Sequence, residues 1–150
     1  MGRAWEDFVP GETIALGERT FTAEEIVDFA RQWDPQPFHL DAEAGAQTHF
    51  GGLVASGWHT ACAFMRLYVD GVLHDSTSLG SPGMSDLRWL RPVRPGETLR
   101  GFVHILEVLP SGKHPDRGTV MMRFEMRNAR DEAAMEATGR GFFGRRTPAT

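Results

Sequence analysis

Two prolines, Pro35 and Pro37, separate Asp34 from His39 and constrain the local fold more than any other feature of the sequence. A proline fixes its own φ at about −65° and disfavours a helical conformation in the residue before it. We therefore expect Asp34 and Gln36 to be extended and the whole segment to be a rigid loop rather than a helix. Such a loop can direct a carboxylate and an imidazole at one point, where they can orient and deprotonate a water molecule. This segment is the strongest candidate for an active site.

A glycine-containing turn, residues 50–57, follows this loop and leads into a predicted helix. The start of a helix presents unpaired backbone N–H groups and a partial positive charge to any oxygen in front of it. We expect this helix at about Ser56 to Asp70, with Gly71 placed to end it. Apolar residues cover most of its circumference, which is typical of a helix buried on several sides.

The composition is that of an ordinary globular domain, and 150 residues correspond to a single domain. The chain is 41% hydrophobic, enough for a real core, and its net charge of −4 argues against binding to nucleic acid. It has no apolar run of the roughly 20 residues that a membrane span needs and no apolar segment that could act as a signal peptide. The single cysteine, Cys62, cannot form an internal disulfide. We therefore expect a cytoplasmic protein.

The remaining elements are predicted from capping signals and from periodicity. Thr22 and Glu25 form a capping-box pattern, with Phe21 and Ile26 at the staple positions, for a helix that ends at Asp34. Alternating apolar residues predict strands in the second half, and we interpret Val72 to Pro82 as a loop. Wrapping an antiparallel sheet around the long helix buries both, which is an α+β arrangement. We expect residues 1–12 and 145–150 to be loose. The predicted strands are Thr13 to Leu16, Ser85 to Leu90, Thr98 to Leu109, Gly118 to Asn128 and Ala133 to Phe143.

Three strings, FARQWDPQPFHLD, FGGLVASGWHT and LRWLRPVRPGETL, resemble the MaoC-like dehydratases, also called (R)-specific or type 2 enoyl-CoA hydratases. The resemblance runs from about Thr13 to Phe143 and implies a hotdog fold. It places Asp34 and His39 at the two catalytic positions. Gly57 matches the glycine at the helix start whose N–H polarises the thioester carbonyl.

Three further positions are judged against the same family. Gln36 stands where the family usually has Asn, and Ser56 where a His often precedes the glycine. Cys62 falls where some members have a serine close to the active site. We take Ser56, Gly57 and Cys62 as the expected substrate-binding residues. The catalytic pair is intact despite the two departures.

The resemblance implies reversible addition of water to a trans-2-enoyl-CoA, giving a 3-hydroxyacyl-CoA in fatty acid metabolism. The expected substrate is a thioester of coenzyme A or of acyl carrier protein, with no metal or other cofactor. The expected assembly is a homodimer, because a curved sheet around one helix leaves its edge strands open. A thioesterase and a noncatalytic acyl-thioester binding subunit remain the alternatives, because fold alone does not determine activity.

Several other residues have simpler interpretations. Cys62 is expected to be a small buried hydrophobe rather than a nucleophile. The spacing of His39, His49 and His59 matches no standard metal-ligand pattern. Isolated arginines are usually solvated, although some could contact the phosphates of coenzyme A; these are Arg91, Arg94, Arg145 and Arg146.

Overall fold

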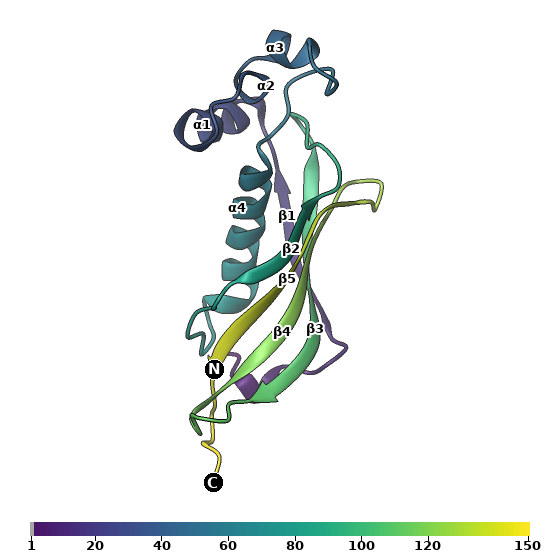
Figure 1. Ribbon diagram of the computed structural model, residues 1–150. Coiled ribbons are helices and arrows are strands. Elements are labelled where there is room, and N and C mark those ends of the chain that lie inside the picture. The colour runs from purple at the N-terminus through teal and green to yellow at the C-terminus, as the bar shows by residue number, and fades with distance from the viewer. Residues whose placement is uncertain (1) are drawn as a thin grey trace.

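The computed structural model describes residues 2–150, and its strands form one five-stranded antiparallel sheet. The strand order is β1-β3-β4-β5-β2, so β1 and β2 are the two edges (Figure 1). Together with the helices this confirms the α+β arrangement, and all five predicted strands are present. The strands are β1 (Thr13–Thr20), β2 (Met84–Trp89), β3 (Thr98–Pro110), β4 (Arg117–Arg127) and β5 (Ala133–Gly144).

Helix α4 (Gly57–Tyr68) lies along one face of the curved sheet (Figure 1). Its buried apolar side chains, among them Phe64 and Leu67, belong to one core cluster with those of the strands. Along residues 98–105 of β3 the positions alternate between half-buried and buried, as expected for a strand with one face on the core. The alternating apolar residues of the sequence therefore identify the face that covers α4. Fully buried strand residues include Leu99, Val103, Val120, Met122 and Met126.

Three short helices gather at the N-terminal end of α4 (Figure 1). They are α1 (Ala23–Trp33), α2 (Pro37–Leu40) and α3 (Ala42–Ala46). Helix α1 begins as expected, because the Thr22 hydroxyl accepts a hydrogen bond from the Glu25 N–H at 3.1 Å. The helix ends at Trp33, so it delivers the chain directly to Asp34.

The expectation that the segment from Asp34 to His39 contains no helix is wrong in its second half. Asp34 and Gln36 are non-helical, as expected, but Pro37 opens the single turn of α2, which contains His39. Proline is compatible with the first position of a helix, because its missing N–H would have no partner there. The prolines therefore exclude helix only up to residue 36.

Gly71 does not end the central helix. After Tyr68 the chain continues into a π-helical turn, η2 (Val69–Leu73), which contains Gly71 and the start of the predicted loop. A Cβ at Gly71 would lie 3.0 Å from a side-chain carbon of Leu16 on β1. The glycine therefore allows close packing against the sheet rather than terminating the helix.

One side of α4 is uncovered, contrary to the expectation of a helix buried on several sides. Trp58 and Met65 are 55% and 46% exposed, and Cys62 is exposed as well.

The two ends of the chain make contacts that we did not expect of loose segments: Phe8 is buried, and the Arg146 guanidinium donates to the Asp7 carboxylate at 2.7 Å. None of the helices in the described part of the chain combines the length and the apolar character needed to cross a bilayer.

Candidate active site

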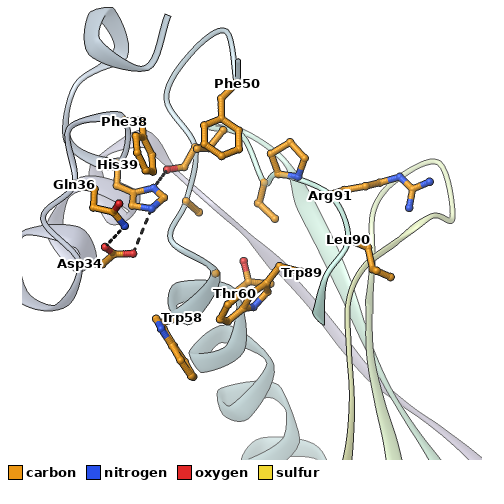
Figure 2. A pocket seen from close by; sticks show the side chains of 15 residues that line it. Asp34, Gln36, Phe38, His39, Phe50, Trp58, Thr60, Trp89, Leu90 and Arg91 are labelled. Atoms are coloured by element: carbon orange, nitrogen blue, oxygen red, sulfur yellow. Dashed lines mark hydrogen bonds and ion pairs between the residues drawn. The ribbon is translucent and has the colours of Figure 1, made fainter. Parts of the chain in front are cut away.

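A cavity of about 410 Å³ lies at the N-terminal end of α4 (Figure 2). Asp34 and His39 line it from the α1–α2 side, and Gly57 lines it from the start of α4. The two catalytic candidates and the helix-start glycine therefore face one cavity, although they lie up to 23 residues apart in the sequence. Much of the remaining wall is apolar and includes Phe38, Phe50, Val54, Trp58, Trp89 and Leu90.

His39 is held in one orientation by two contacts. Its Nδ1 lies 2.7 Å from the carbonyl oxygen of Val54, and its Nε2 lies 3.3 Å from Oδ2 of Asp34. A carbonyl oxygen only accepts hydrogen bonds, so Nδ1 carries a proton. Nε2 is therefore the nitrogen that can exchange a proton at the carboxylate. The His39 side chain is only 7% exposed, so its orientation is set by its surroundings rather than by solvent.

Asp34 is held as a carboxylate by its neighbours. Burial raises its pKa, but hydrogen bonds from Ser56 and Gln36 and the charge of His39 outweigh this effect, so the pKa lies below the usual range. The Ser56 hydroxyl donates to Oδ2 at 2.7 Å and the Gln36 amide donates to Oδ1 at 2.7 Å. Asp34 is therefore ionised at neutral pH and can accept a proton or orient a water molecule.

Ser56 connects the carboxylate to the start of α4. It is the N-cap residue, and its Oγ accepts a hydrogen bond from the Trp58 N–H at 3.2 Å while it donates to Asp34. Gly57 is the first residue of the helix, and no group in residues 2–150 accepts a hydrogen bond from its N–H. This N–H, at the positive end of the helix, can stabilise an oxyanion in the cavity.

Gly57 also has a packing role, because the indole of Trp89 rests against it. A Cβ at position 57 would lie 2.4 Å from Cδ2 of Trp89, well inside van der Waals contact. The absence of a side chain at Gly57 is therefore required by packing, and this is compatible with polarisation of a carbonyl by its N–H. The sequence gives no local signal for the contact, since Trp89 comes from β2.

The other expected substrate-binding residues lie elsewhere. Cys62 is exposed, not the small buried hydrophobe that we expected, and is not among the residues that line this cavity. Ser56 is fully buried behind Asp34 and does not line the cavity either. Its role as the N-cap could have been recognised, because serine before an apolar helix is a common capping signal.

Only one of the four arginines considered for phosphate contacts, Arg91, lines the cavity. Its guanidinium donates to the Ala133 carbonyl at 2.9 Å and lies 3.2 Å from the Glu132 carboxylate. Arg146 pairs with Asp7 at the end of the chain instead. Arg91 is therefore a surface arginine at the cavity whose charge is already partly matched.

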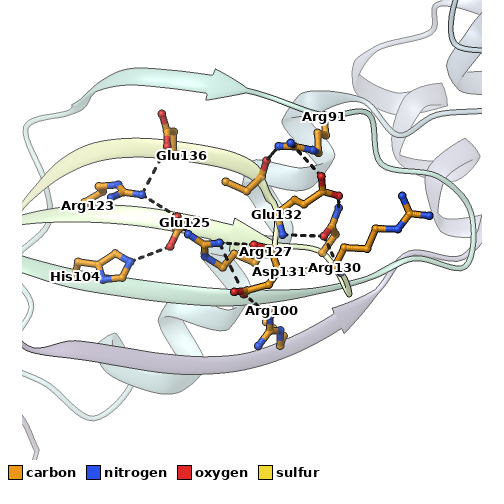
Figure 3. Close-up of polar contacts among 12 residues, drawn as sticks. Arg91, Arg100, His104, Arg123, Glu125, Arg127, Arg130, Asp131, Glu132 and Glu136 are labelled. Atoms are coloured by element: carbon orange, nitrogen blue, oxygen red, sulfur yellow. Dashed lines mark hydrogen bonds and ion pairs between the residues drawn. The ribbon is translucent and has the colours of Figure 1, made fainter.

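A second polar cluster surrounds Glu125 of β4 (Figure 3). Its carboxylate is 2% exposed and accepts hydrogen bonds from His104, Arg123 and Arg127 at 2.8 to 3.0 Å. Burial raises the pKa of Glu125, but these donors lower it below its usual value. Glu125 alternates with the core residues Phe124 and Met126, so it lies on the face of the sheet away from α4. The charge of Glu125 is therefore matched by side chains of the sheet itself.

Comparison with known proteins connects this cavity to a family. The model of the MaoC like domain matches residues 7–136. The chain is similar to the crystal structure of a MaoC-like dehydratase from Rhodospirillum rubrum, with 37% identity, a TM-score of 0.87, and coverage of 97% of this chain and 99% of that one. It is also similar to R-hydratase PhaJ1 from Pseudomonas aeruginosa, with a TM-score of 0.78 over 97% of this chain and 88% of that one. That likeness, at 20% identity, is one of fold.

Protein MaoC of Klebsiella aerogenes is 33% identical to the chain over 97 residues. The match covers 64% of this chain but only 28% of MaoC, so the chain spans less than a third of that relative. The hotdog fold expected from the sequence is confirmed by the solved structures. Because the family model covers well over half of the sequence, the chain belongs to the MaoC-like domain family.

Proposed function

We propose that the protein catalyses the reversible addition of water to a trans-2-enoyl thioester, giving a 3-hydroxyacyl thioester. One observation carries this proposal: Asp34 and His39 are in contact and line the same cavity as Gly57, the first residue of α4. An acid–base pair and an unpaired backbone N–H are what this reaction requires. Membership of the MaoC-like domain family supports the same reaction class.

Each step of the reaction has a group to perform it. Asp34 and His39 hold a water molecule and take one of its protons as its oxygen bonds to the β-carbon of the enoyl group. The electrons of the double bond move to the thioester oxygen, and the proton is then delivered to the α-carbon. General acid–base catalysis of this kind is typically worth about 10² to 10⁴ in rate.

The enolate oxygen that forms in this step needs a donor. The N–H of Gly57 meets this need at the positive end of α4, and one such donor is worth roughly 10² to 10³ in rate. Only water is gained or lost, so the chemistry requires no change of oxidation state. The reaction at the acyl group is the same on coenzyme A and on acyl carrier protein.

Incubation with crotonyl-CoA tests the proposal against its two alternatives. We expect the absorbance of the conjugated thioester to fall without release of free thiol. Release of free thiol would instead identify a thioesterase. Binding of crotonyl-CoA with no change in either signal would identify a noncatalytic binding subunit.

A further inference from the structure

The wall of the active-site cavity contains one polar side chain to which the proposed reaction gives no role, Thr60 of α4. This residue lines the cavity and is only 2% exposed, so the protein encloses it almost completely. The other polar side chains of the wall have hydrogen-bond partners within the protein; they are Asp34, Gln36, His39 and Arg91. Thr60 therefore provides a polar group that the protein itself does not use.

The hydroxyl of Thr60 is free to donate a hydrogen bond. In a helix, a threonine hydroxyl commonly bonds to the carbonyl three or four residues earlier. The carbonyl of Ser56, four residues earlier, already accepts hydrogen bonds from the N–H groups of His59 and Thr60, at 3.0 and 3.2 Å. Within residues 2–150, Nδ1 of His59 is the only side-chain atom that is both unpaired and sealed inside the protein. The Thr60 hydroxyl, which also has no partner in these residues, therefore reaches the open space of the cavity.

The hydroxyl lies on the side of Thr60 that faces Gly57. Thr60 follows Gly57 by three residues, so the two residues are neighbours on the surface of α4. Helical side chains lean back over the turn that precedes them, and Figure 2 shows the Thr60 oxygen pointing toward the start of α4. Gly57, whose N–H is unpaired, lines the same cavity at that start. One backbone donor and one side-chain donor are therefore available at the same end of the cavity.

We infer that the Thr60 hydroxyl is a second hydrogen-bond donor to the thioester oxygen, an inference that rests on the proposed function. As water adds to the β-carbon, negative charge collects on this oxygen, which can accept hydrogen bonds from both Gly57 and Thr60. A donor that its surroundings already hold in place needs no reorganisation when the charge forms. The hydroxyl keeps its proton throughout, so Thr60 stabilises charge, whereas Asp34 and His39 move protons.

Hydration of crotonyl-CoA by two variants of Thr60 tests the inference. Thr60→Val has nearly the same shape but no hydroxyl, and it lowers kcat by roughly 10² to 10³, the range for loss of one such donor. KM changes little, because the donor acts on charge that is present mainly in the transition state. Thr60→Ser keeps the hydroxyl and retains most of the activity. Because Thr60 transfers no proton, the pH dependence of kcat/KM is the same in both variants as in the wild type.

Thr119→Val is the matched control for Thr60→Val. Thr119 is a half-buried threonine of β4 that does not line the cavity, so this variant keeps the kcat of the wild type. An equal fall of kcat in Thr60→Ser and Thr60→Val would show that the shape of the side chain matters and not its hydroxyl, and the inference would be wrong. A higher KM with unchanged kcat in Thr60→Val would also overturn it, because the hydroxyl would then contact another part of the substrate.

Infrared difference spectroscopy of bound butyryl-CoA, isotopically labelled at the carbonyl carbon, separates this inference from the proposed function, because a saturated thioester cannot be hydrated. Even a weak hydrogen bond lowers the stretching frequency of a carbonyl, so the band lies lower in the wild type and in Thr60→Ser than in Thr60→Val. This difference, without hydration of crotonyl-CoA by the wild type, retains the Thr60 donor and rejects the hydratase. Hydration by the wild type, with the same kcat and the same carbonyl band in Thr60→Val, retains the hydratase and overturns the inference.

Discussion

At the scale of single residues, the key feature is the way Asp34 is held. Ser56 and Gln36 each donate a hydrogen bond to its carboxylate, and these bonds lower its pKa against the effect of burial. We predict that Ser56→Ala raises the pKa of Asp34 and moves the acidic limb of the profile of kcat/KM against pH to higher pH. Loss of the N-cap also costs about 0.5–2 kcal/mol in the free energy of unfolding.

Gln36→Ala separates these two effects, because Gln36 holds the other carboxylate oxygen and its side chain makes no cap of α4. It should shift the acidic limb in the same direction with little change in the free energy of unfolding. An acidic limb that stays in place in both variants would show that these two hydrogen bonds do not lower the pKa of Asp34.

A second residue makes stability depend on pH. His59 is 8% exposed, its Nδ1 has no hydrogen-bond partner in residues 2–150, and its ring stacks on Phe29 at 4.9 Å. Burial lowers its pKa in the folded protein. As the pH falls below about 6.5, the ordinary pKa of histidine, the unfolded chain takes up the proton first. We therefore predict that the free energy of unfolding decreases on the acid side of this pH.

Urea unfolding at a series of pH values measures this effect. The variant His59→Phe keeps an aromatic ring in the slot but cannot take up a proton, so it should lose less stability between neutral pH and mildly acidic pH than the wild type. Parallel curves for the two proteins would show that His59 does not contribute.

The contacts in the site that could be predicted from the sequence are those between residues that lie close together in the chain. The proximity of Asp34 and His39 could be predicted because two prolines and a motif join them within one short segment. The contacts of His39 with the Val54 carbonyl and of Gly57 with Trp89 depend on segments brought together by the tertiary fold. No local pattern could reveal them.

At the scale of elements, the packing of β2 against α4 depends on the absence of a side chain at Gly57. We predict that Gly57→Ala destabilises the protein by about 1–3 kcal/mol, as expected when a methyl group is forced into a filled space. Trp89→Ala removes the ring that the new Cβ would meet, so Gly57→Ala should cost much less in that background. A double-mutant cycle from urea unfolding measures this coupling. Additive costs would show that the contact with Trp89 is not what requires glycine.

The elements were predicted well where periodicity is strong. The strands were located because buried and exposed positions alternate along them, and α1 because Thr22 caps it. The errors lie at the ends of helices: Gly71 allows close packing against Leu16, and Pro37 opens a turn rather than preventing one. A glycine can end a helix or allow close packing, and the tertiary structure decides between these roles at Gly71. A proline can prevent a helix or begin one, and its position at the start of α2 decides between these roles at Pro37.

At the scale of the whole molecule, we predict that the protein forms a homodimer. The sheet has two edges, β1 and β2, and an unpaired edge tends to be covered or paired. Large apolar side chains are exposed around β2 and the uncovered side of α4, which favours this edge as the interface. These side chains are Trp58, Met65, Met84, Trp89 and Leu90, each at least 43% exposed.

Sedimentation velocity at micromolar concentration tests this prediction, and we expect a single dimeric species. Met84→Lys places a charge on the β2 side and should shift the protein toward monomer, whereas Leu106→Lys on β3 should not. Wild-type protein that sediments only as a monomer at this concentration would contradict the prediction.

Asp34 and His39 are proposed to act as a unit on one water molecule, and hydration of crotonyl-CoA by three variants of this pair and one control variant tests this most directly. We predict that Asp34→Asn and His39→Ala each lower kcat by at least about 10². The double variant should be hardly worse than either single one, because removing one member of a unit already removes its function. Cys62→Ala, an exposed residue outside the cavity, should keep its activity. Full activity in Asp34→Asn, or losses that multiply in the double variant, would contradict the account.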